Sequence, residues 1–208
     1  MITRRKYGDA GQAFPIYITV VGGLLFLAFA YLAVGQAAAN RNGAQTAADA
    51  AALAAAQDAR DQLAGQWVED ILDPMKWQDI FDGNVDGLSP SCWRADQLAA
   101  QNDAHVEACA PTDPLGYEVE VETDTPVGDS IVPGTEEKFA KASATAVIEP
   151  RCAFELPGED DGGDEGDGND VLPLPQLTCE DKNWDLDPNG PDALLPGSED
   201  LFDVHLAD

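Results

Sequence analysis

The chain has 208 residues and a formal charge of −28, because 39 Asp and Glu residues face only 11 Lys and Arg. A surface this acidic repels the phosphates of nucleic acids and of anionic lipids, so nucleic acid is excluded as a partner of the water-exposed part. Acidic residues are densest after Pro150, where only Arg151 and Lys182 oppose them.

The first predicted element is a membrane span near the N-terminus. Residues Phe14 to Val34 form a run of 21 residues without a charge. At about 1.5 Å of rise per residue, a helix of this length reaches about 30 Å, which matches the hydrocarbon core of a bilayer. We therefore predict a transmembrane helix over 14–34 after a short polar leader over 1–13. Pro15 falls in the first turn, where helices tolerate proline.

Charge around this run predicts its orientation. Three cations, Arg4 to Lys6, precede it against Asp9 alone, and the first cation after it is Arg41. Lys and Arg near a span tend to remain cytoplasmic. The leader is therefore expected in the cytoplasm, and the C-terminal part outside a single-pass cell-membrane protein. The alternative is a secretory signal cleaved near 37–39, whose apolar core usually has about 7–15 residues, and hence a secreted protein.

An Ala-rich segment over 35–65 follows and contains no proline. Because Ala is the strongest helix former, we predict one helix of roughly 50 residues, half in lipid and half a protruding stalk. Small residues at every fourth position let helices approach closely. We expect contacts with other membrane components or a second copy through Gly35, Gly43, Gln45 and Asp49. The alternative is that small residues recur here only because Ala is abundant.

An exported domain is predicted over 66–156. The stretch from Gln66 to Phe81 is amphipathic and is interrupted by Pro74, which indicates two short helices with a bend. A further short helix is expected around Ala95–Glu107.

Two segments then alternate as half-buried strands do. Apolar residues and Thr123 alternate with three glutamates over Tyr117–Thr123, and small residues alternate over Phe139–Ile148. We predict that these strands pair antiparallel through a loop at 124–138 and that the second lies close to the end of the stalk helix. A last strand, Leu201–Leu206, joins the sheet, so the fold class is α+β.

The segment over 157–170 is acidic and almost without apolar residues, so we predict a disordered acidic loop. Residues 171–208 are then expected to return to the domain.

The cysteines are all located after the span, at Cys92, Cys109, Cys152 and Cys179. An even number on the oxidising side of a membrane predicts two disulfides. Of the three possible pairings, the sequential one, Cys92–Cys109 and Cys152–Cys179, closes the shortest loops and is favoured. The alternative is a zinc site with Cys92, His105 and Cys109 as ligands, but an oxidising compartment disfavours free thiolates.

Few residues point to chemistry. Asp185, Asp187 and Asn189 match the opening of a calcium loop, but Pro196 stands where such a loop needs glutamate. An acidic turn is therefore favoured over a metal site. His105 and His205 alone could act as bases near neutral pH, and there is no nucleophile motif and no phosphate-binding glycine loop. We predict no enzymatic activity and no cofactor.

The residues from Asn42 to Ala56 read NGAQTAADAAALAAA, and Gly11-Gln12-Ala13 precedes the span. This combination resembles the N-terminal module of the TadE/TadG-like proteins of tight-adherence (Flp) pilus assembly, over about 45 residues. The resemblance implies a membrane-anchored, pilin-like component of a pilus or secretion machine. Processed pilin-like members carry glutamate five residues after a glycine, whereas Ile16 follows Gly11 at that spacing, so the unprocessed TadG-like form fits better. The alternative function is a cell-surface calcium- or ligand-binding module.

Overall fold

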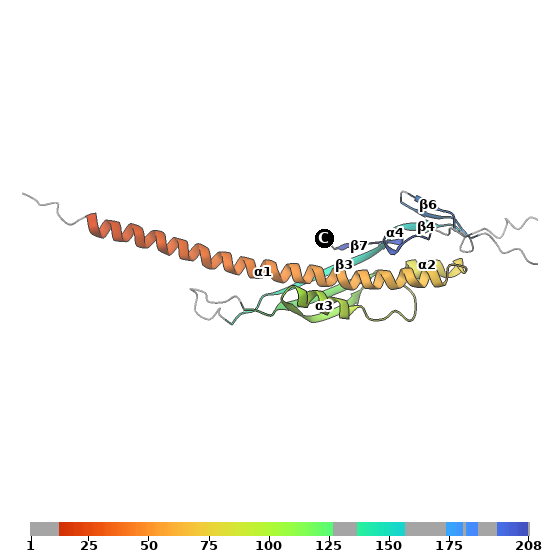
Figure 1. Cartoon of the computed structure of the whole chain (residues 1–208), viewed down its shortest axis with the longest axis horizontal. Helices are drawn as coiled ribbons and strands as arrows, with labels where there is room; N and C mark the ends of the chain where they lie inside the picture. Colours follow the sequence, from red (N-terminus) through yellow and green to blue (C-terminus); the bar gives the residue numbers. More distant parts are fainter. Residues whose placement is uncertain (1–12, 127–136, 157–173, 181, 187–194, 208) are drawn as a thin grey trace, which may run out of the picture.

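A computed structural model describes residues 13–126, 137–156, 174–180, 182–186 and 195–207. One helix runs through most of the length of the molecule, and the strands gather around its second half (Figure 1). The predicted acidic loop over 157–170 lies outside the described residues, as do the leader up to residue 12, Asp187 and Asn189.

The long helix, α1, spans Ala13–Glu69 and has 57 residues. The prediction of one continuous helix is confirmed, and α1 extends further than expected. Its last turn takes up the first part of the predicted amphipathic stretch, so Gln66 does not begin a separate helix. The break at Pro74 is confirmed, since a short 3-10 helix, η1 (Pro74–Lys76), leads into α2 (Trp77–Phe81).

The predicted helix over Ala95–Glu107 is wrong in its second half. Helix α3 spans Cys92–Gln101, and strand β1 begins at Ala104 and ends at Thr112. Between them Asp103 adopts φ 55°, in the left-handed region, which ends the helical path. Residues 104–107 therefore belong to the sheet.

The main sheet has four antiparallel strands in the order β1-β2-β3-β7. Its other members are β2 (Gly116–Thr123), β3 (Lys141–Pro150) and β7 (Phe202–Leu206). The predicted pairing of the two alternating strands and the return of the last strand are both confirmed. A second sheet, which the sequence did not predict, consists of β4 (Cys152–Phe154), β5 (Leu177–Cys179) and β6 (Lys182–Trp184). A single turn of helix, α4 (Ser198–Leu201), leads into β7.

One face of the main sheet is covered and the other is open. Val119 and Val121 on β2 are fully buried, whereas Glu118 and Glu120 are exposed. The covered face packs on α1 through β2, β3 and β7 and on α3 through β1. The faces predicted from alternation on β2 are therefore confirmed.

Alanines of α1 form the centre of this packing. Seven of them have no exposed surface: Ala44, Ala47, Ala48, Ala51, Ala52, Ala55 and Ala56. A methyl side chain lets the helix axis lie close to the strands, and Ala142, Ala144 and Ala146 on β3 add small side chains from the sheet. The second half of α1 is therefore the core of the domain, and not a stalk that only other chains could cover.

The end of the domain far from the apolar half of α1 is closed by aromatic rings. Trp77 packs between Trp67 and Phe154 at centroid distances of 5.3 and 5.2 Å. Phe81 lies 5.9 Å from Phe154 and 5.5 Å from Phe202. These contacts join α1, α2, β4 and β7, so segments far apart in the sequence share one cluster.

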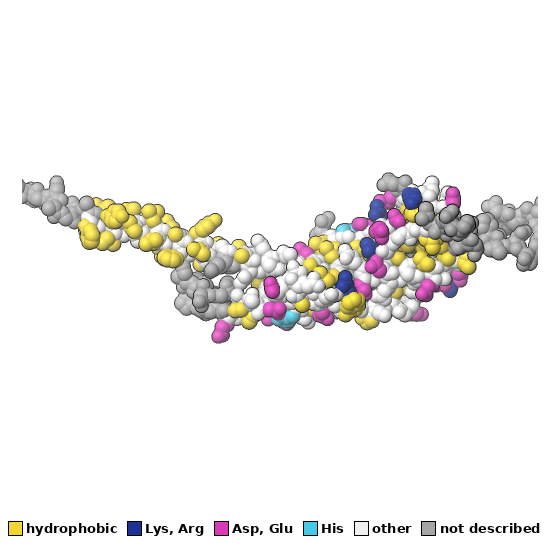
Figure 2. Space-filling view, in the orientation of Figure 1, with side chains coloured by type: hydrophobic (Ala, Val, Ile, Leu, Met, Phe, Trp, Pro, Cys, Tyr) yellow, Lys and Arg dark blue, Asp and Glu magenta, His cyan; other side chains and the backbone are white. Residues whose placement is uncertain are grey.

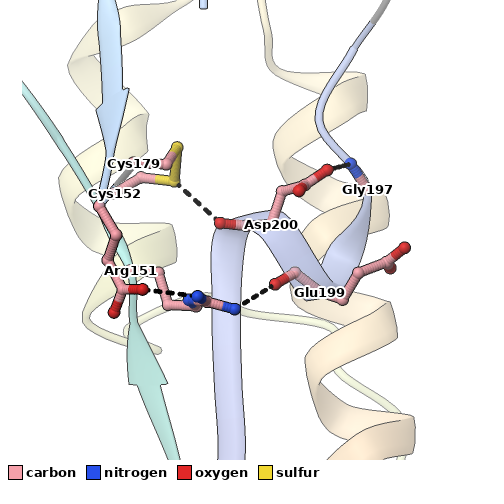
Figure 3. The surroundings of a disulfide bond; sticks show 7 residues. Arg151, Cys152, Cys179, Gly197, Glu199 and Asp200 are labelled. Atoms are coloured by element: carbon pink, nitrogen blue, oxygen red, sulfur yellow. Dashed lines mark hydrogen bonds and ion pairs between the residues drawn. A yellow bond between two sulfur atoms is a disulfide. The ribbon is translucent and has the colours of Figure 1, made fainter. Parts of the chain in front are cut away.

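The disulfides are Cys92–Cys109 and Cys152–Cys179, which confirms the sequential pairing. The first joins α3 to β1, and the second joins β4 to β5 at directly opposed positions. Figure 3 shows the second disulfide beside α4, with Cys152 Sγ 3.2 Å from the carbonyl oxygen of Asp200. Arg151 donates to the carbonyl oxygen of Glu199, which holds α4 beside the sheets, and to the carboxylate of Glu180, which directly follows β5.

The alanine packing predicts the effect of a larger side chain. Ala51→Leu forces three extra carbons into filled space and should lower the free energy of unfolding by about 1–3 kcal/mol. Gln57→Leu adds leucine at an exposed position of the same helix and should leave it nearly unchanged. Urea unfolding of the full chain in detergent, followed by tryptophan fluorescence, measures both. Equal stability of the two variants would contradict the packing described for α1.

Candidate functional site

The first half of α1 is apolar and exposed. Thirteen of its large apolar side chains between Phe14 and Val34 are 53–81% exposed, and Val21 is half-buried. They cover the free part of the helix in Figure 2, whereas acidic side chains are spread over the domain. In the described part of the chain one helix is long and apolar enough to cross a membrane, and no residue of its most apolar stretch is buried.

The neck over 35–43 joins this apolar half to the buried half. A Cβ added at Gly35 or Gly43 would meet no atom of the described residues within 4 Å. The described part of the chain therefore leaves both glycines uncovered.

The other two predicted contact residues are engaged within the chain. Gln45 Nε2 donates to Asp49 Oδ1 at 2.8 Å and to the carbonyl oxygen of Ser143 on β3 at 3.3 Å. This pair therefore ties α1 to the start of β3. Ala47, from the same row of small residues, is fully buried under the sheet.

A network of charged side chains lies at the end of the sheet where β3 begins. His105 Nδ1 is 2.8 Å from Asp124 Oδ1, and its Nε2 is 3.2 Å from Glu107 Oε1. Lys141 Nζ lies 3.1 Å from Glu107 and 3.1 Å from Glu122. The hydrogen bond to Asp124 raises the pKa of His105 and outweighs the opposing effect of desolvation, and the contact with Glu107 adds a smaller effect that also raises it.

The same contacts shift the pKa values of Glu107 and Lys141. The hydrogen bond and charge of Lys141 lower the pKa of Glu107, and His105 contributes in the same direction. The two glutamates raise the pKa of Lys141. The network therefore favours the charged form of all three side chains.

The remaining candidates from the sequence are located as follows. Cys92 and Cys109 are joined to each other, so no thiolate remains for the alternative zinc site. His205 lies on β7 with its Nδ1 3.1 Å from Asp203 Oδ2. Asp185 accepts a hydrogen bond from Gln176 Nε2 at 2.9 Å, and the other two residues of the calcium motif are outside the described residues.

Residues 11–58 match the Tad family model, described as Flp pilus-assembly TadE/G-like. The N-terminal module is TadE/TadG-like. The match covers less than a quarter of the chain and ends inside α1, so it includes the apolar half, the neck and the first buried alanines. No curated protein and no solved structure gave a significant match to the chain. From residue 13 onward the match falls on α1, and none of it falls on the strands of either sheet.

Sequence reasoning missed the charged network beside this module. Only His105 was singled out. Glu107 follows it by two residues on β1, but Glu122 and Lys141 join this group only through strand pairing. His105 stands opposite Glu122, and Glu122 stands opposite Lys141. The alternating glutamates of β2 were a visible signal of an acidic face, but the register that brings the three strands together is not visible in the sequence.

The network predicts how pH acts on the domain. The pKa of His105 is raised in the folded state, so its pairing stabilises the fold fully below the unfolded value of about 6.5 and loses this effect as pH rises through the folded pKa. Asp124→Asn should lower the His105 titration midpoint in an NMR titration. It should also reduce the unfolding free energy more at about pH 5.5 than at about pH 9.

Asp203→Asn is the control for this titration, since Asp203 contacts His205 and both lie on β7, away from His105. It should leave the His105 midpoint unchanged. A His105 midpoint at or below the ordinary value in the unaltered chain would contradict the network.

Proposed function

We propose that this chain is a non-enzymatic, single-pass membrane component of a Flp pilus-assembly or secretion machine. The observation that carries the proposal is the division of α1. One half is apolar and exposed, and the other half is the core of a folded domain. The TadE/TadG-like match includes residues of both halves and supports the proposal that the anchor belongs to a pilus-assembly machine.

The anchor follows from the cost of leaving the first half of α1 in water. Each large apolar side chain gains about 1.5–3 kcal/mol when it is moved from water to an apolar environment. More than ten such side chains stand exposed around the whole helix between Phe14 and Val34. A single helical neighbour would cover one side only, whereas lipid covers all sides. The hydroxyl of Thr19 donates to the Pro15 carbonyl oxygen at 2.8 Å, which satisfies this polar group within the helix.

Two independent features support a cytoplasmic N-terminus and an external domain. The cations at 4–6 precede the apolar run, as the positive-inside bias requires. Both disulfides belong to the domain, and disulfides persist in oxidising compartments. The C-terminal domain would then stand outside the cell membrane.

The neck is the proposed contact surface for helices of other machine components. From Val34 to Ala44, the first fully buried alanine, the helix rises about 15 Å. Over this distance α1 leaves the proposed span and enters the domain, and no atom of the described residues lies within 4 Å of a Cβ added at Gly35 or Gly43. Small residues there would allow a partner helix, or α1 of a second copy, to approach closely.

The membrane anchor is tested with charged substitutions. Leu24→Arg combined with Leu27→Arg places two cations near the middle of the apolar run, where each costs about 2.5–3.5 kcal/mol for insertion. The variant should become extractable from vesicles by carbonate, whereas the unaltered chain should stay in the pellet.

The matched control is Val68→Arg with Leu72→Arg. Leu72 is 64% exposed, which matches the 62% of Leu24 in the test variant. This control should remain in the membrane fraction because these residues lie outside the span. Extraction of the unaltered chain would remove the anchor from the proposal. If a thiol label reaches the cysteines from the cytoplasm of intact cells without added reductant, the orientation of the chain is the reverse of the proposed one.

The neck is tested by filling a glycine. Gly43→Leu should reduce co-purification of other membrane components at least about fivefold, because overpacking a close helix contact costs about 1 kcal/mol or more. Gly65→Leu is the control. A Cβ at Gly65 also meets no atom of the described residues within 4 Å, but Gly65 lies in the domain half of α1 and not in the neck. Quantitative mass spectrometry of affinity-purified complexes measures both. Ala47→Leu is unsuitable because Ala47 is buried in the core.

A further inference from the structure

We propose that His105, Glu107 and Glu122 form a surface site for a divalent transition metal, with Zn²⁺ as the probe. A ligand atom from each of these side chains lies within 4.8 Å of the others. Their donors are one imidazole nitrogen and two carboxylate groups, a set that suits Zn²⁺ and leaves a position for water. The site is independent of the proposed membrane function.

Strand register brings the ligands together. His105 on β1 stands opposite Glu122 on β2, so the two share the open face of the sheet. Between Val106 and Ala108 the register of β1 shifts, which leaves Glu107 as the extra residue of a β-bulge. This bulge places the Glu107 carboxylate beside the other two groups.

The two glutamates already converge on a cation. Lys141 Nζ lies 3.1 Å from Glu107 Oε2 and 3.1 Å from Glu122 Oε2, so the ammonium group occupies the space between both carboxylates. Lys141 is the first residue of β3, and its side chain is exposed and long enough to move aside. A divalent ion in that space would interact with the same two carboxylates and would carry twice the charge of the ammonium group.

Asp124 orients the imidazole for this role. The Nδ1–H of His105 donates to Asp124 Oδ1 at 2.8 Å, which leaves the other nitrogen, Nε2, directed at Glu107. Metal-ligating histidines usually donate their second ring nitrogen to a carboxylate in this way. Binding would release the Nε2 proton to solvent, form the Nε2–metal bond and displace the Lys141 ammonium group from the carboxylates.

The ligands must close slightly around the ion. Tetrahedral ligands at 2.0–2.2 Å from Zn²⁺ lie about 3.4 Å from one another. His105 and Glu107 are both exposed and Glu122 is half-buried, so rotation of these side chains supplies the remaining distance.

Isothermal titration of the full chain in detergent with ZnCl₂, at about pH 7.5 where His105 can release its proton, tests the site. We expect one ion per chain and at least about tenfold weaker binding for His105→Gln and for Glu122→Gln. Asp124→Asn should weaken binding about 10–100-fold through loss of orientation. Lys141→Gln should strengthen it, because the competing cation is removed.

The control is His205→Gln, which removes the other imidazole that contacts a carboxylate and should leave Zn²⁺ affinity unchanged. Circular dichroism establishes that each variant is folded. The proposal is overturned if His105→Gln keeps the full affinity, if Lys141→Gln does not raise it, or if the unaltered chain gives no one-site isotherm. Binding of Ca²⁺ alone at this cluster would equally overturn it, since the imidazole would then have no role.

Discussion

The structure depends on one close contact, between the alanine-lined half of α1 and the main sheet. Alanines on both α1 and β3 meet in it, so the backbones of helix and strand can lie near each other. Alanine loses almost no side-chain entropy on burial, which offsets the small apolar area that each methyl group covers. Larger buried side chains supply apolar area that the alanines cannot: Leu63 and Trp67 at the far end of α1, and Trp77 on α2. The first group sets the distance between the layers, and the second contributes much of the burial.

Because the same helix continues without a break into the apolar half, the domain has no flexible joint to that half within α1. Pro15 lies near its start, and no proline follows it before Glu69. In the proposed membrane setting, tilt or rotation of the anchor would be transmitted directly to the sheets. The TadE/TadG-like module is therefore both the proposed anchor and a large part of the domain core, and its match ends at residue 58, inside α1.

Several elements could be predicted because their signals are local. Alternation over residues 117–123 correctly predicted which side of β2 is buried, since a strand has period two. Strand β1 was missed because Pro111, three alanines and the bulge after Val106 hide its alternation. The second sheet was missed because its strands have three residues each, too few to show a period. The row of small residues on α1 was visible, but its spacing carries no information on whether the partner is another chain or the chain's own sheet.

The sequence alone determined the length and apolarity of the first half of α1, the continuity of the helix and the polarity of the two faces of β2. Each depends on residues within a few turns or strand positions of one another, where helix propensity and side-chain period act. Only the tertiary structure decided that the alanines face the sheet and that Gln45 reaches Ser143 across 98 residues of sequence. It also decided that Glu122 and Lys141 join His105 and Glu107. These depend on register and packing between distant segments, and no local preference encodes them.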